Sequence, residues 1–194
     1  MNQSFVNCRL NYHFPENESN FSAMKIFLIG YMGSGKSRLS KSLASKLGFL
    51  HFDTDDLIEI DFGKNISDIF KTEGEEKFRK RESFILKELR DTLNAVVATG
   101  GGLPCFENNM EWMNDNGLTV YLEATPRFLF QRLKSSSAKR PLLEGFTEDE
   151  LLEYITTHLE VRKKFYEQAS LKVNAVSLSS SKLAKLISDR IQSN

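Results

Sequence analysis

Residues 30–37 carry the sequence Gly30-Tyr31-Met32-Gly33-Ser34-Gly35-Lys36-Ser37, which fits the pattern G-x-x-x-x-G-K-[ST] at every position. An apolar run of branched and aromatic residues, 25–29, precedes it and is typical of a buried strand in a parallel sheet. Behind it, leucines recur at every fourth position and Gly48 follows, which predicts a helix over 36–47. A strand, a glycine-rich turn and a helix in this order are the setting in which the pattern forms a phosphate-binding loop.

The residue types of this loop suit a nucleoside triphosphate. Glycines such as Gly33 and Gly35 let backbone N–H groups around Ser34 converge on phosphate oxygens without obstruction by a Cβ atom. The helix that follows directs its positive end at the anion. Lys36 can reach the β and γ phosphates, and the Ser37 hydroxyl can bind Mg²⁺. The alternative is an accidental glycine-rich turn, and the flanking strand and helix argue against it.

The rest of the chain repeats the alternation of short apolar runs and helical periods. Such alternation is typical of an α/β sandwich built on a parallel sheet. Strands are predicted at 25–29, 49–52, 95–98, 118–122 and 171–173. Helices are predicted at 36–47, 55–70 with an interruption near Gly63, 74–91, 107–115, 126–133, 148–168 and 181–192.

Composition and charge exclude several other classes of protein. Among 194 residues, 26 Lys and Arg balance 26 Asp and Glu, so neither nucleic acid nor a membrane surface is an expected partner. The two cysteines, Cys8 and Cys105, lie far apart, so neither a zinc site nor a disulfide is expected. Residues 1–23 are rich in Asn and Ser and are predicted to be a disordered extension, with Met24 as an alternative start. We expect one domain over 24–194, as a cytoplasmic monomer.

Two further segments are predicted to face the loop. Asp53-Thr54-Asp55 follows the second predicted strand and Gly100-Gly101-Gly102 follows the third. Ligands collect at the carboxyl ends of strands in an open parallel sheet. One carboxylate there can hold the waters of Mg²⁺, and a second can orient or deprotonate an attacking hydroxyl. Helix N-capping is the alternative role for Asp53 and Asp55, but it leaves the glycine triplet unexplained.

The sequence lacks the full motif sets of two other classes of nucleotide-using protein. The chain has no N-K-x-D motif, which counts against a GTPase. Asp61-Phe62-Gly63 spells the DFG of protein kinases, but neither an H-R-D loop nor a V-A-I-K strand accompanies it. We interpret this tripeptide as the end of a helix with a glycine stop.

Taken together, these motifs make the sequence resemble the shikimate kinase family over residues 24 to about 175. Each of the short motifs is weak, and their order and spacing together are specific. The motifs are residues 30–37, Asp53-Thr54-Asp55, Phe78-Arg79 with Glu82, Gly100-Gly101-Gly102, Arg140-Pro141-Leu142-Leu143, and Arg162 with Phe165-Tyr166.

The resemblance implies a fold and a set of roles. The fold is a three-layer sandwich with a five-stranded parallel sheet of order 2-3-1-4-5, a lid at about 135–148 and a substrate-binding segment at about 53–92. The implied catalytic residues are Lys36, Asp55 and Arg140. The implied ATP-binding residues are Gly33, Ser34, Gly35, Lys36, Ser37, Arg132 and Arg140. The implied substrate-binding residues are Asp55, Arg79, Gly100, Gly101, Gly102 and Arg162, and the implied metal-binding residues are Ser37 and, through water, Asp53.

The arginines have a second interpretation. A guanidinium binds a carboxylate with two parallel hydrogen bonds, and a cleft for two anions needs such cations. Arg79, however, belongs to a basic run and stands three residues before Glu82, so a local ion pair is available. Arg162 begins another basic run, 162–164. Taken singly, each arginine is better explained as part of a solvated helix face, and the order of the motifs favours binding.

The activity implied by the resemblance is transfer of the γ-phosphate of ATP to the 3-hydroxyl of shikimate, with Mg²⁺, in aromatic amino-acid biosynthesis. The transfer is expected to be direct and in line, because no nucleophilic His or Cys is expected at the site. Cys105 is expected to be a semi-buried thiol without a role, and His51 has no predicted partner. Two alternatives remain open: another small-metabolite or nucleotide kinase, such as gluconate kinase, and a nucleotide-binding protein without kinase activity.

Overall fold

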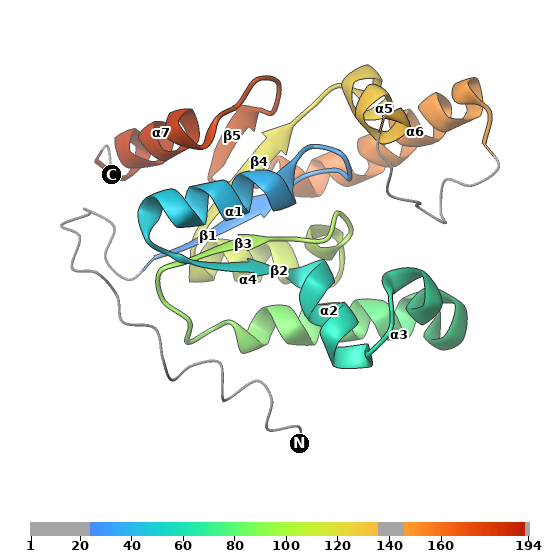
Figure 1. Ribbon diagram of the computed structural model, residues 1–194, viewed down its shortest axis with the longest axis horizontal. Helices are drawn as coiled ribbons and strands as arrows, with labels where there is room; N and C mark the ends of the chain where they lie inside the picture. The colour runs from blue at the N-terminus through green and yellow to red at the C-terminus, as the bar shows by residue number, and fades with distance from the viewer. Residues whose placement is uncertain (1–23, 136–145, 193–194) are drawn as a thin grey trace.

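The computed structural model describes residues 24–135 and 146–192, and its centre is a five-stranded sheet (Figure 1). All neighbouring strands are parallel, and their order is β2-β3-β1-β4-β5. This confirms the predicted fold class and strand order. The strands are β1 (Lys25–Ile29), β2 (Leu50–Asp53), β3 (Ala95–Ala98), β4 (Leu118–Glu123) and β5 (Leu171–Asn174).

Helices cover both faces of the sheet, so the central strands are buried on both sides (Figure 1). Ile26 and Leu28 of β1 face one core, to which α1 (Lys36–Leu47) and α7 (Ser180–Gln192) contribute. Phe27 and Ile29 alternate to the other face, where they pack with residues of the remaining helices. This burial explains why β1 has the continuous apolar sequence of a parallel strand rather than alternating polarity.

The other helices lie on that second face or at the carboxyl edge of the sheet (Figure 1). Within the described residues, no helix is long and apolar enough to cross a lipid bilayer. The helices are α2 (Thr54–Phe62), α3 (Ile66–Glu88), the short 3₁₀ helix η2 (Leu103–Cys105), α4 (Asn109–Asn116), α5 (Pro126–Lys134) and α6 (Glu148–Tyr166).

Helix boundaries between residues 54 and 91 differ from the prediction by only a few residues. Gly63 ends α2 in a left-handed conformation, as the interpretation of Asp61-Phe62-Gly63 requires. A new helix then starts behind the Asn65 cap, whose side chain accepts a hydrogen bond from the N–H of Asp68. Gly74 is non-helical, with φ 80° and ψ 163°, and divides α3 at a kink into two helical pieces, as the separate helix predicted from Gly74 requires. The cap at Asn65 provides a start signal that the periodicity of residues 55–70 does not reveal.

Candidate active site

The glycine-rich loop joins β1 to α1 at the carboxyl edge of the sheet. Gly35 is the N-cap of α1 and has a φ of 100°, a conformation that favours glycine. The buried ammonium of Lys36 turns back over the loop, where Nζ donates to the carbonyl oxygens of Gly30, at 2.7 Å, and Tyr31, at 3.0 Å. The Ser34 hydroxyl oxygen is buried and has no hydrogen-bond partner in the described part of the chain. Donors thus gather inside the loop, as phosphate binding requires.

A cavity of about 540 Å³ continues from the loop along α1. Its walls come from α1, from Phe128 and Arg132 of α5, and from the segment between β5 and α7. Arg132 lies near the loop, since Nη2 is 3.8 Å from the position of a Cβ on Gly35. The structure therefore brings Arg132 to the predicted nucleotide side. Residues 175–179 of the last wall were not predicted, and their only signal in the sequence is their place after the carboxyl end of β5.

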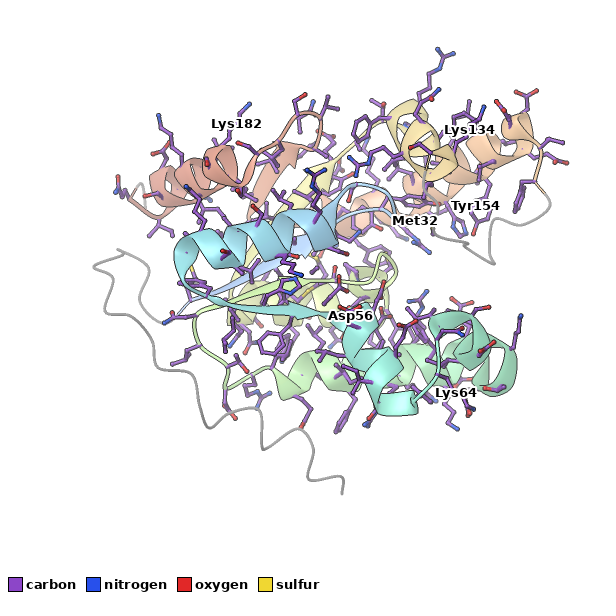
Figure 2. All side chains as sticks on the ribbon, viewed as in Figure 1. Met32, Asp56, Lys64, Lys134, Tyr154 and Lys182 are labelled. Carbon is purple, nitrogen blue, oxygen red and sulfur yellow. The ribbon has the colours of Figure 1, made fainter. Side chains whose placement is uncertain are left out.

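Asp53 ends β2 and caps α2. Its Oδ1 accepts a hydrogen bond of 3.1 Å from the N–H of Asp55, so the capping role considered for Asp53 is present. Capping uses one of the two carboxylate oxygens of Asp53, and the residue still lies at the carboxyl edge of the sheet. Figure 2 marks this edge by Met32 in the loop and Asp56 at the start of α2.

A hydrogen-bonded chain ties β2 to the first turn of α1. The Ser40 hydroxyl donates to the carbonyl of Ser37 at 3.0 Å, and it lies 2.9 Å from Nε2 of His51. A hydroxyl has one proton, so His51 is the donor in the second contact. This pair, which the sequence did not predict, links the strand that carries Asp53 to the helix that carries Ser37.

The glycine triplet 100–102 is the point at which side chains from three helices converge. A Cβ on Gly100 would lie 2.2 Å from Oε1 of Glu82 and 2.8 Å from Oδ1 of Asp55. A Cβ on Gly102 would lie 2.6 Å from the guanidinium carbon of Arg79. A Cβ at either position would force these side chains to move.

Arg162 reaches the same triplet from α6. Its Nη1 is 3.4 Å from the position of a Cβ on Gly101, and its guanidinium lies 5.5 Å from the ring centroid of Tyr31. The Tyr166 hydroxyl fixes this corner by donating to the carbonyl of Gly101 at 2.6 Å. Arg79 and Arg162 are far apart in sequence, yet both face one short stretch of backbone. The structure therefore brings together the predicted substrate-binding residues that it describes.

Arg79 also forms the local ion pairs that were its alternative interpretation. Its Nη1 donates to Glu82 at 2.7 Å, and Nε lies 3.4 Å from Glu75. The rings of Phe78 and Phe70 lie 5.1 and 5.9 Å from its guanidinium. With its side chain only 15% exposed, Arg79 is not on a solvated helix face. The local pairs hold the guanidinium at the triplet.

Glu82 was expected only as a local partner of Arg79 and was not among the predicted site residues. Its side chain is buried, and Oε1 has no hydrogen-bond partner among the described residues. Burial raises the pKa of the Glu82 carboxyl to about 7, Arg79 opposes this rise, and the nearby Asp55 adds to it. Its three-residue spacing from Arg79 predicted the ion pair but not the burial or the contact with the triplet.

Cys105 and His51 are the remaining side chains near the site that could act as nucleophiles. Cys105 on η2 is a free, partly buried thiol, as expected, and burial raises its pKa to about 11. His51 has a partner after all, in Ser40. The predicted lid residue Arg140, and the predicted extension 1–23, lie outside the described residues.

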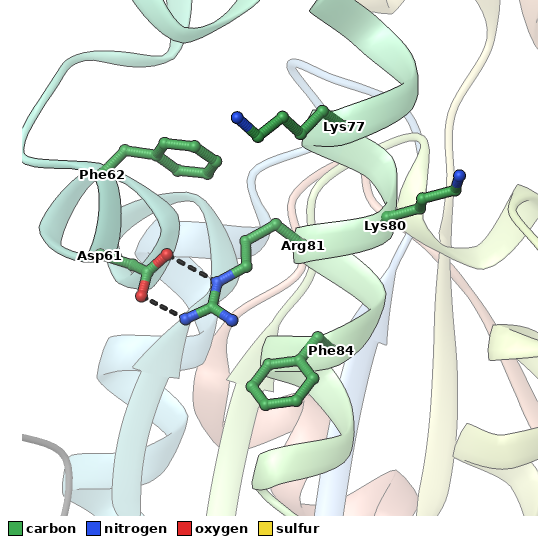
Figure 3. A pocket seen from close by; sticks show the side chains of 6 residues that line it. All are labelled: Asp61, Phe62, Lys77, Lys80, Arg81 and Phe84. Carbon is green, nitrogen blue, oxygen red and sulfur yellow. Dashed lines mark hydrogen bonds and ion pairs between the residues drawn. The ribbon is translucent and has the colours of Figure 1, made fainter. Parts of the chain in front are cut away.

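A second cavity, of about 500 Å³, lies between α2 and α3 (Figure 3). It includes none of the predicted site residues. Its cations are all paired: Arg81 with Asp61 across the two helices, Lys77 with Glu73, and Lys80 with Glu76. The DFG tripeptide thus supplies a carboxylate that holds α2 to α3.

A phosphate-binding loop on a parallel sheet of order 2-3-1-4-5, with an arginine-lined cleft beside it, defines a P-loop kinase of small molecules. The family model for shikimate kinase matches residues 32–192. The chain belongs to the shikimate kinase family, a family of ATP-dependent phosphotransferases that acts in aromatic amino-acid biosynthesis.

Individual relatives agree with this assignment. Shikimate kinase of Bacteroides fragilis is 45% identical over 147 residues, which cover 76% of this chain and 82% of the relative. The crystal structure of shikimate kinase from Bacteroides thetaiotaomicron superposes with a TM-score of 0.82 at 41% identity, covering 85% of this chain and 98% of that one. Shikimate kinase from Acinetobacter baumannii in complex with shikimate gives a TM-score of 0.77 at 34% identity, covering 89% and 94%.

Proposed function

We propose that this chain transfers the γ-phosphoryl group of ATP to the 3-hydroxyl of shikimate, and that shikimate binds at the glycine triplet 100–102. The observation that carries the proposal is the convergence of Asp55, Glu82, Arg79 and Arg162 on that triplet, at the carboxyl edge that also bears the phosphate-binding loop. Two guanidinium groups and two carboxylates around one short stretch of backbone suit a hydroxy acid.

The two arginines bind the carboxylate of shikimate in this proposal. Arg79 is pre-oriented by Glu82 and the phenylalanine rings, and Arg162 lies over Tyr31. Pre-orientation matters because a guanidinium that is already held loses little freedom when it binds. The free backbone beside Gly101 lets a substrate hydroxyl approach the main chain, where a Cβ would obstruct it.

Asp55 is proposed to orient the 3-hydroxyl and to accept its proton. The bond between the β-bridging oxygen and the γ-phosphorus breaks while the 3-oxygen bonds to phosphorus, and ADP leaves. A phospho-enzyme is not needed: the Cys105 thiol has a raised pKa, and His51 is engaged with Ser40. Lys36 stabilises the charge that develops on the transferring group.

Mg²⁺ and ATP are the proposed cofactor and co-substrate. Ser37 and Asp53 offer oxygen atoms only, which is the donor chemistry that Mg²⁺ prefers, with phosphates and water completing its coordination. The His51–Ser40 chain supports this fit, because it joins the elements that carry the two donors. Mg²⁺ would neutralise phosphate charge when bound. The remaining ATP-side residues of the proposal are Gly33, Ser34, Gly35, Lys36 and Arg132.

We also propose that residues 24–194 form one kinase domain. Its substrate-binding segment would be residues 53–92. Its lid would be residues 135–148, with Arg140 reaching the phosphates. Arg140→Ala is expected to lower kcat, and full kcat in this variant would remove Arg140 from the proposal. A monomeric state and a cytoplasmic location remain predictions.

ADP release in a coupled assay tests the function. ADP should form from MgATP when shikimate is added, and much more slowly without it. Gluconate and nucleoside monophosphates in place of shikimate should leave the slow rate unchanged. ATP binding without shikimate-dependent ADP release would instead indicate an idle kinase site.

A further inference from the structure

Tyr166 is a buried residue at the end of α6 that the proposed function does not use. Its hydroxyl donates to the carbonyl oxygen of Gly101 at 2.6 Å, although the two residues are 65 positions apart in the chain. Its ring packs against Tyr121 of β4, with the ring centroids 5.2 Å apart. Burial raises the pKa of the Tyr166 hydroxyl, so the group stays protonated at neutral pH. The side chain is thus held by its ring and offers its proton to the glycine triplet.

The hydrogen bond from Tyr166 sets the direction of the peptide group between Gly101 and Gly102. This peptide bond is trans, so its C=O and its N–H point in opposite directions. With the carbonyl of Gly101 turned toward Tyr166, the N–H of Gly102 is turned away from it. Two glycines flank this peptide group, and glycine allows more backbone conformations than any other residue. A contact from outside the triplet is therefore needed to hold one orientation.

The N–H of Gly102 is a donor without an acceptor among the described residues. Gly102 is buried, and the guanidinium carbon of Arg79 lies 2.6 Å from the position that a Cβ on it would take. Buried backbone N–H groups are rarely left unpaired in proteins. A free donor beside this arginine therefore favours an oxygen atom of a bound ligand as its acceptor.

Tyr166 also ties the helix that carries Arg162 to the triplet. The two residues stand one turn apart on α6, so their side chains lie on the same face of the helix. Nη1 of Arg162 is 3.4 Å from the position of a Cβ on Gly101, whose carbonyl oxygen accepts the hydrogen bond from Tyr166. One hydroxyl group thus links the orientation of the peptide group to the place of this arginine.

We propose that Tyr166 is a positioning residue for shikimate, because it holds the peptide group between Gly101 and Gly102 in the orientation that offers the Gly102 N–H to a substrate oxygen. The proposal rests on the proposed function, since it takes the triplet as the shikimate site. Tyr166 touches no substrate in this arrangement and acts through the main chain. Its hydroxyl should therefore matter for shikimate binding and not for nucleotide binding, whereas a loss of core packing would affect both.

Tyr166→Phe tests the proposal, because it removes the hydroxyl and keeps the ring. Isothermal titration calorimetry measures the dissociation constants for shikimate and for ADP separately. Shikimate should bind about 3- to 15-fold more weakly to the variant, which corresponds to the loss of one hydrogen bond. ADP should bind with the affinity of the wild type. Tyr121→Phe is the matched control, because it removes the hydroxyl of the other ring of the same buried pair, and it should change neither constant.

The wild type provides a second measurement that does not depend on how the variant folds. In spectra of the ¹⁵N-labelled protein, the amide proton signal of Gly102 should shift when shikimate is added to saturation, because its N–H gains an acceptor. An unmoved Gly102 signal, wild-type affinity for shikimate in Tyr166→Phe, or equal losses of affinity for shikimate and ADP would each overturn the proposal. Failure of the wild type to bind shikimate would instead contradict the proposed function.

Discussion

Glu82 holds Arg79 with one carboxylate oxygen and faces Gly100 with the other. Oε2 accepts a hydrogen bond of 2.7 Å from Nη1 of Arg79. Oε1 lies 2.2 Å from the position that a Cβ on Gly100 would take. The same buried carboxylate thus orients the arginine that we propose to bind substrate, and it lies where a side chain at the start of the triplet would be. Substitutions at each of these three residues test this relationship.

Gly100→Ala should destabilise the protein by about 1–3 kcal/mol, because the new methyl group displaces the buried carboxylate of Glu82 and the neighbouring carboxylate of Asp55. Urea unfolding measures the change. Gly101→Ala is the matched control, since the nearest atoms to its Cβ lie 3.4 Å away, and it should cost much less. Equal losses in the two variants would show that the triplet is not packed as described.

Glu82→Gln should alter the pH dependence of stability. The folded-state pKa of Glu82, about 7, is raised above that of an unfolded glutamate, so the folded state holds the proton more strongly. This group therefore lowers the free energy of unfolding of the wild type as pH rises from about 4.5 to 7, by at most about 3 kcal/mol, and has no further effect above that range.

The variant lacks this titration. The difference in unfolding free energy, Glu82→Gln minus wild type, should rise between pH 5 and pH 7.5 in chemical denaturation at a series of pH values. A difference that stays constant over this interval would place the carboxyl pKa of Glu82 near its ordinary value.

Arg79→Ala should raise the KM for shikimate much more than the KM for ATP. Loss of one charge-assisted contact costs about 1.5–3 kcal/mol, which is about 10- to 150-fold in affinity. Steady-state kinetics with each substrate varied in turn measures the two constants. Because the variant leaves Glu82 buried without its partner, circular dichroism must first establish that it folds.

Lys80→Ala is the control for Arg79, because Lys80 is an exposed neighbour whose ion pair within the described ranges is with the exposed Glu76. It should change neither constant. Equal effects of Arg79→Ala on both substrates would assign Arg79 a structural role.

Lys36→Ala should lower kcat by at least about 100-fold, because the lysine charge is needed most as charge shifts on the γ-phosphate in the transition state. Lys46→Ala, at the far end of the same helix, should retain the wild-type rate. Turnover near the wild-type rate in Lys36→Ala would remove the phosphate-binding assignment of the loop.

Local features were predictable from the sequence because neighbouring residues create them. The loop of residues 30–37 needs only a strand before it, a helix behind it and glycines between, and all of these lie within 23 residues of one another in the chain. The strands could be placed because a parallel strand buried on both faces is apolar throughout. Family motifs then supplied the strand order and the candidate site residues.

Tertiary structure decided what distant residues do together. Arg79 and Arg162 each had a sound local explanation, and only the packing of α3 and α6 against the triplet brings both to one stretch of backbone. The Ser40–His51 contact, the wall formed by residues 175–179 and the burial of Glu82 likewise join segments that are separate in sequence. Burial sets the electrostatics of such groups, and burial depends on every element that packs around them. A sequence pattern covers the residues of one element at a time. It could therefore identify these side chains but not the residues that pack around them.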